Sequence, residues 1–178
     1  KSLVNLSLAS VALIAVGFFG SVKADPLKVG FIYIGPTGDH GWTYEHDQGR
    51  LAIDKALGSK VKTTYVEKVP ESADAARGLT KLATSGHKLI FTTSFGYMNP
   101  TLKVAKKFPN VKFEHATGYK RSKNVSTYSG RFYEGRHVAG LIAGKMTKAN
   151  VIGYVASFPI PEVIRGINAT IIAARSVN

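Results

Sequence analysis

The chain has 178 residues, 44% of them hydrophobic, and a formal net charge of +13 at neutral pH. This length fits one domain, or one lobe and part of another. The absence of cysteine excludes disulfides, thiolate metal sites and the lipid-bearing cysteine of a bacterial lipoprotein. The lysines are mostly spread singly and form no dense basic run, so the charge indicates a solvated basic surface and not nucleic-acid binding.

Residues 1–24 have the layout of a secretory signal peptide. Lys1 is basic, the densest apolar run is Val11–Phe19, and Val22-Lys23-Ala24 forms a small-x-Ala exit. An uncleaved anchor that keeps the protein at the membrane is the alternative, because the uncharged run Ser2–Val22 is long enough to cross a bilayer. We favour cleavage, and therefore export to the bacterial periplasm.

After this segment, β-rich runs alternate with helical patterns. The predicted elements are strand Lys28–Ile34, helix Thr43–Leu57, strand Val61–Val66, a helix capped by Ser72 and followed by Gly86, strand Lys88–Thr93, helix Pro100–Lys107 and strand Val111–Ala116. Strands joined by helices in this order require right-handed crossovers and a parallel sheet. We therefore expect an α/β fold with a Rossmann-like lobe over residues 25–121.

The remaining sequence predicts the beginning of a second α/β lobe. Residues 122–131 are polar and are interpreted as a crossover or hinge that includes a short strand at Val125–Tyr128. Residues 132–178 contain the pattern of helix Tyr133–Met146, strand Val151–Ala156 and helix Glu162–Ala174. A lone strand between two helices needs a sheet to join, so we expect this second lobe to be incomplete.

Aromatic and small polar residues gather where the predicted strands end, which is where parallel sheets bind their ligands. Trp42, the only tryptophan, follows the first strand and could stack on a flat ring, or it could cap the core. Asp39 could accept a ligand N–H or bond the backbone of its own turn. Similar runs at Ser94–Asn99, Thr117–Tyr119 and Ser157–Pro159 follow later strands. Together they predict a planar, uncharged small-molecule ligand.

The run after the third strand offers the most varied contacts. Ser94 and Asn99 carry groups for directional hydrogen bonds, and Gly96 permits close backbone approach. The alternative is that Phe95 and Tyr97 merely pack under the loop.

The sequence shows no pattern typical of catalysis. It lacks a nucleophile elbow, a phosphate-cradling Gly-rich loop and a metal-binding His-Glu-x-x-His helix, and its histidines are scattered. We therefore expect no enzyme activity, metal or cofactor. A nucleotide-dependent enzyme is one alternative, although Pro36 disrupts the glycine fingerprint it would need. The ligand-sensing lobe of a transcription regulator is another, against which the signal peptide and the missing helix-turn-helix count.

Five blocks resemble the basic membrane protein (BMP) family, in the order in which that family has them. They read KVGFIYIGPTGDHGWTYEHDQG, TTSFGYMNP, KFPNVKFEHATGY, YEGRHVAGLIAGKMT and IGYVASFPIPEVIRGIN. Members are substrate-binding components of bacterial ABC transporters and are similar to type I periplasmic binding proteins. The resemblance implies a monomer that binds a purine base or nucleoside by aromatic stacking in a cleft between two lobes and docks on a membrane permease.

The resemblance also implies roles for individual residues. Trp42 matches the stacking aromatic and Asp39 its preceding acid, whereas Thr43 stands where the family often has Asn. Thr117 replaces the acid that many members have after the fourth strand, which leaves a free base such as adenine as the expected ligand. The candidate ligand contacts are Asp39, Trp42, Thr43, Ser94, Phe95, Gly96, Asn99, Thr117 and Phe158.

The family fold needs a second lobe of about the same size as the first. We therefore interpret the chain as a fragment that lacks the opposite wall of the cleft and binds its ligand weakly when alone.

Overall fold

The computed structural model describes residues 24–178. The predicted signal peptide, apart from Ala24, lies outside the described residues. Within them, no helix combines the length and the apolar character needed to cross a membrane.

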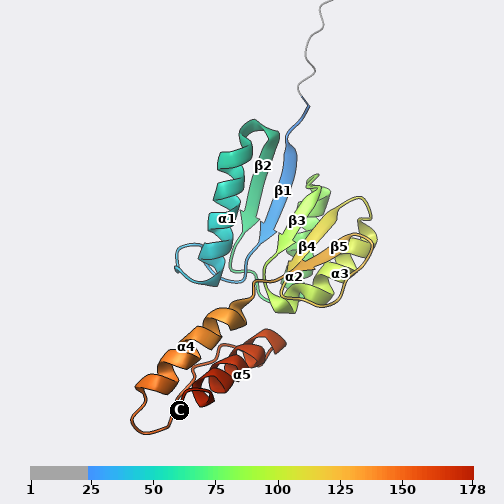
Figure 1. The fold of residues 1–178 in the computed structure, drawn as a ribbon. Helices are drawn as coiled ribbons and strands as arrows, with labels where there is room; N and C mark the ends of the chain where they lie inside the picture. Colours follow the sequence, from blue (N-terminus) through green and yellow to red (C-terminus); the bar gives the residue numbers. More distant parts are fainter. Residues whose placement is uncertain (1–23) are drawn as a thin grey trace, which may run out of the picture.

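The first part of the described chain is an open parallel sheet with helices on both faces (Figure 1). Its elements are β1 (Leu27–Ile32), α1 (Trp42–Leu57), β2 (Val61–Val66), α2 (Ala73–Thr84), β3 (Leu89–Thr92), α3 (Met98–Lys107), β4 (Lys112–Ala116) and β5 (Val125–Tyr128), with short 3₁₀ turns at Gly58–Lys60 and Phe95–Tyr97. The strands lie in the order β2-β1-β3-β4-β5, and every pair is parallel. The predicted α/β class with a parallel sheet is confirmed.

Two layers of apolar side chains hold this sheet. The larger cluster lies between the sheet and helices α2 and α3, and it includes Ile32, Leu79 and Phe113. A smaller cluster around Phe31 and Tyr33 includes Ile53 of α1 on the opposite face. Because both faces are covered, the inner strands are buried along most of their length, as the near-continuous apolar runs predict.

The connection from β4 to β5 has no helix, although parallel strands are usually joined by a dozen or more residues. Asn124 anchors this short crossover, because its side-chain amide donates to the carbonyls of Ala105, Phe108 and Val111 at 2.9–3.1 Å. The strand predicted at Val125–Tyr128 therefore completes the first sheet. The assignment of residues 122–131 as a crossover or hinge stays a prediction.

Helices α4 (Phe132–Met146) and α5 (Pro161–Arg175) follow the sheet and pack against each other (Figure 1). Two glycines of α4 make this close packing possible. A Cβ at Gly140 would overlap the carbonyl oxygen of Thr170, and a Cβ at Gly144 would lie 2.6 Å from the carbonyl oxygen of Ala174. The helices therefore meet backbone to backbone.

The predicted strand at Val151–Ala156 is wrong. This segment is irregular, and Val151 and Val155 are 77% and 102% exposed. The pattern of residues is suited to a strand, but a strand is stable only beside a partner, and the described part of the chain offers no sheet next to α4 and α5.

Replacing Gly140 by Ala should separate α4 from α5. We expect the free energy of unfolding to fall by about 1–3 kcal/mol, because the new methyl group collides with backbone that cannot yield. Urea unfolding followed by circular dichroism measures this. The matched control is Gly135→Ala, where no atom lies within 4 Å of the added Cβ. That variant should be neutral or gain up to about 1 kcal/mol from helix propensity, and equal losses in both variants would contradict the close packing.

Candidate functional site

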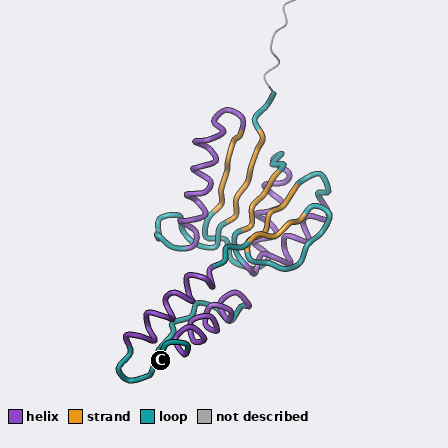
Figure 2. The backbone as a smooth tube through the Cα atoms, in the orientation of Figure 1, coloured by secondary structure: helices purple, strands orange, loops and turns teal. Residues whose placement is uncertain are grey.

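The loops that follow the strands meet at the carboxyl edge of the sheet, where α4 also begins. Figure 2 shows these teal loops gathered at the lower ends of the orange strands. They comprise residues 33–41 after β1, 67–72 after β2, 93–97 after β3 and 117–124 after β4. Most of the candidate ligand contacts lie in these loops or in the first turn of the following helix.

Trp42 is half-buried at this edge as the first residue of α1. Its indole N–H donates to the carbonyl of Thr93, with a distance of 2.5 Å between Nε1 and the oxygen. Its ring lies 4.8 Å from that of His46 and 5.8 Å from that of Phe132, the first residue of α4, measured between centroids. The only tryptophan of the chain is therefore fixed at the end of β3, next to the first residue of α4.

The other two candidates of the first loop are engaged with its backbone. Asp39 is exposed, and its Oδ1 accepts the N–H of Gly41 at 2.9 Å, which is the local turn bond considered above as the alternative. Thr43 is only 1% exposed, and its hydroxyl oxygen accepts the N–H of Gly35 at 3.0 Å. Thr43 thus stabilises the loop after β1 from within the fold, while Oδ2 of Asp39 accepts no hydrogen bond from residues 24–178.

An acid that the sequence analysis did not select organises the loop after β3. Glu71, in the loop after β2, accepts a hydrogen bond from the hydroxyl of Ser94 and another from the N–H of Gly96, the latter at 2.8 Å to the same Oε1. A Cβ at residue 96 would overlap the Glu71 carboxylate, so only glycine leaves room for it. The position of Glu71 at a strand end was the one available signal, since the sequence does not say which loops bond to each other.

Phe95 and Asn99 each contact the loop after β4. Phe95 is half-buried and its ring lies 6.2 Å from that of Tyr119, while Asn99 accepts from the Lys120 ammonium at 3.2 Å. Phe158 is 67% exposed in the loop between α4 and α5, and it takes part in none of the ring contacts among residues 24–178. Phe158 therefore makes no ring contact with Trp42 or Phe95.

Backbone strain is concentrated at the strand ends. Thr117 has φ +63°, a left-handed conformation that is unfavourable for a β-branched residue, and its N–H donates to the Tyr128 carbonyl at 2.8 Å. His40 and Lys68, in the loops after β1 and β2, also have positive φ values of 53° and 56°. Strain of this kind persists where the surrounding structure imposes it, which is common at ligand sites.

A buried histidine lies beneath these loops. His115 of β4 is fully buried, and its Nδ1 lies 2.8 Å from the hydroxyl oxygen of Thr92, whereas its Nε2 has no hydrogen-bond partner among residues 24–178. Burial lowers the pKa of His115 to about 4, against smaller opposing effects of the Thr92 hydrogen bond and the charge of Glu71. The imidazole is therefore neutral at pH 7.

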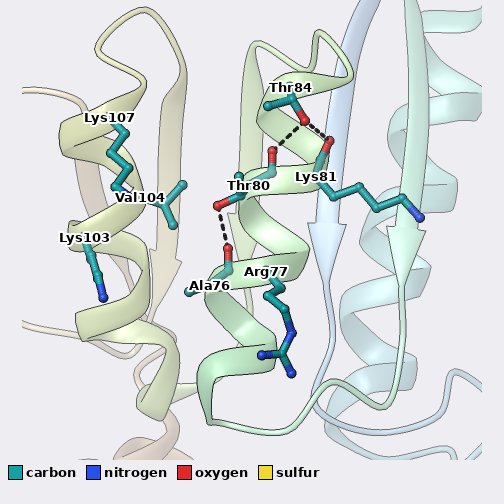
Figure 3. A pocket seen from close by; sticks show the side chains of 8 residues that line it. All are labelled: Ala76, Arg77, Thr80, Lys81, Thr84, Lys103, Val104 and Lys107. Atoms are coloured by element: carbon teal, nitrogen blue, oxygen red, sulfur yellow. Dashed lines mark hydrogen bonds between the residues drawn. The ribbon is translucent and has the colours of Figure 1, made fainter.

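No trio of histidine and acidic side chains in the described part of the chain is arranged to hold a metal ion. A groove of about 460 Å³ does occur, but its lining residues all belong to α2 and α3, away from the strand-end loops (Figure 3). They are Ala76, Arg77, Thr80, Lys81, Thr84, Lys103, Val104 and Lys107. The long side chains are solvent-exposed cations, and Lys81 extends away from α3. The groove contains none of the predicted ligand contacts.

Comparison with protein families gives a match over residues 27–178. The matching family model is Bmp, described as ABC transporter substrate-binding protein PnrA-like. Among solved structures, a solute-binding protein of an ABC transporter system from Aeropyrum pernix superposes with a TM-score of 0.74 at 25% identity, covering 86% of this chain and 44% of the other.

Two relatives differ in the ligand their names carry. A purine-binding protein of Brucella abortus is 59% identical, covering 96% of this chain and 49% of the relative. A Haloferax volcanii protein, TsgA13, named as a candidate glucose-binding protein of an ABC transporter, is 44% identical over 89% of this chain and 40% of its own length. The chain thus spans about half the length of the curated relatives it matches.

Acid should destabilise the fold through His115. The unfolded chain takes up a proton near pH 6.5 and the folded protein only near pH 4, so stability that is present above pH 6.5 is lost as the pH falls through this window. We expect a loss of roughly 2 kcal/mol between pH 7 and pH 5 from this residue. Urea unfolding at both pH values measures it. His115→Gln should flatten the dependence, whereas a variant of the exposed His137, His137→Gln, should retain it; equal slopes in wild type and His115→Gln would contradict the assignment.

Proposed function

We propose that this chain, which belongs to the PnrA-like family of ABC transporter substrate-binding proteins, holds a purine base against Trp42 at the carboxyl edge of its sheet. The observation that carries the proposal is the hydrogen bond from the indole N–H to the Thr93 carbonyl. It occupies the only polar atom of the ring, so what remains available to a ligand is the aromatic surface. An aromatic face that is fixed in place stacks on a planar heterocycle, a contact worth about 1–3 kcal/mol per base.

The polar groups around Trp42 support a ligand that donates hydrogen bonds. The donors of Ser94 and Gly96 are already bound to Glu71, and Gly41 is bound to Asp39. The carboxylates each retain an oxygen that accepts no hydrogen bond within residues 24–178. Purine bases carry ring and exocyclic N–H groups, which suit such acceptors.

Glucose is the second candidate ligand, and the 44% identical TsgA13 is the observation that favours it. Aromatic rings and carboxylates also bind sugars, so the same edge suits glucose. We favour a purine because the relative named for purine binding is 59% identical over nearly the whole chain.

Capture of the ligand would require a second wall. We propose that this wall comes from protein corresponding to the half of the relatives that this chain does not match, and that the two lobes close around the ligand and present a shape that docks on a membrane permease. Export by a signal peptide would place this event in the periplasm. We infer a carrier and not an enzyme, in keeping with the family.

Titration of adenine into this chain tests the proposal, with Trp42 as the only tryptophan fluorophore. We expect quenching of the indole emission with a dissociation constant of about 1 mM or somewhat tighter, because one stacking face and a few hydrogen bonds amount to roughly 4 kcal/mol. N-acetyltryptophanamide is the control for collisional quenching.

Two outcomes would contradict parts of the proposal. A response to D-glucose without a response to any purine would replace the ligand. Micromolar affinity for adenine would show that a single wall is enough, and would refute the need for the second one.

A further inference from the structure

The carboxylate of Glu71 is held in one orientation. Its Oε1 accepts from the Ser94 hydroxyl and the Gly96 N–H, while Oε2 receives no hydrogen bond from any residue between 24 and 178. Glu71 is exposed at the edge of the sheet. Two donors hold Oε1, and the carboxylate packs against Gly96, where an added Cβ would overlap Oε2, so the position of Oε2 is set before any ligand arrives.

The acceptor and the proposed stacking ring are both held at the end of β3. Trp42 bonds the carbonyl of Thr93, and Glu71 bonds the hydroxyl of the next residue, Ser94. The indole and the carboxylate are therefore attached to consecutive residues at the end of β3. The charge of Glu71 also acts on the buried His115, the neighbouring strand's residue paired with Thr92.

We propose that Glu71 is a specificity-determining residue of the purine site, whose Oε2 accepts an N–H from the edge of the base that stacks on Trp42. The inference rests on the proposed function and adds the group that distinguishes one flat ligand from another. A stacking ring binds any flat molecule. A fixed carboxylate raises the affinity for a molecule that presents an N–H and lowers the affinity for one that presents a lone pair or a methyl group.

The substitution Glu71→Gln tests this at a single atom. The amide oxygen of Gln still accepts from Ser94 and Gly96, so the loop keeps its bonds, while the other position changes from an acceptor into an N–H donor. The matched control is Glu67→Gln in the same loop, where the carboxylate oxygen Oε2 accepts from the N–H and the hydroxyl of Thr37 at 2.8 and 3.2 Å.

The measurement is the ratio of affinities for adenine and for two analogues, 6-dimethylaminopurine and 9-methyladenine, by quenching of Trp42 emission. Each analogue lacks one kind of N–H. The wild type should prefer adenine over at least one analogue by about tenfold or more, the effect of a hydrogen bond to a charged group. Glu71→Gln should abolish that preference, and Glu67→Gln should keep it. A ratio of affinities is insensitive to a small loss of folded protein, so it separates recognition from stability.

Gly96→Ala provides a second, independent variant. The added methyl group overlaps the Glu71 carboxylate and must displace it, without changing its charge. The same loss of preference is expected, whereas Gly38→Ala, which adds a methyl group to open space in the first loop, should leave the preference intact. If Glu71→Gln or Gly96→Ala retains the wild-type preference, the role of Glu71 is overturned. If the wild type responds to no purine, the proposed function fails first and this inference with it.

Discussion

The hydrogen bond between the indole of Trp42 and the carbonyl of Thr93 connects two of the segments that meet at the carboxyl edge of the sheet. It joins the first residue of α1 to the residue that follows β3, across 51 positions of sequence. Carbonyls at the ends of parallel strands have no further strand residue to bond, so they must find side chains or water. Here an aromatic donor takes this role, and the edge gains a flat apolar surface in the process.

Acidic residues hold the other loops of this edge in a similar way. Glu67 binds the loop after β1 through Thr37, Glu71 binds the loop after β3, and Asp39 closes its own turn onto Gly41. In each case one carboxylate oxygen serves the fold. The other oxygen of Glu71 and of Asp39 accepts no hydrogen bond within residues 24–178, so the same side chains that stabilise the loops also offer acceptors at this edge.

The order and type of the elements in the sheet could be predicted from the sequence, because each apolar run or helical pattern reports on burial that is local to it. The BMP resemblance was likewise confirmed by the family match. The strand at Val151–Ala156 failed for the opposite reason, since strand formation depends on a neighbour that no local pattern reveals. The bonds of Glu71 and Thr43 depend on which loops meet, and such contacts join residues 25 and 8 positions apart. Whether the candidate residues contact a ligand stays a prediction.

The glycine contacts between α4 and α5 bear on the order in which the chain acquires structure. Glycine is a poor helix former, costing about 1 kcal/mol relative to alanine, and α4 contains Gly135, Gly140 and Gly144. Such a segment gains its helical state from the partner it touches, and that partner includes Ala173 and Ala174. During synthesis, α4 would therefore leave the ribosome as a fluctuating coil and become a helix only after some thirty further residues had emerged.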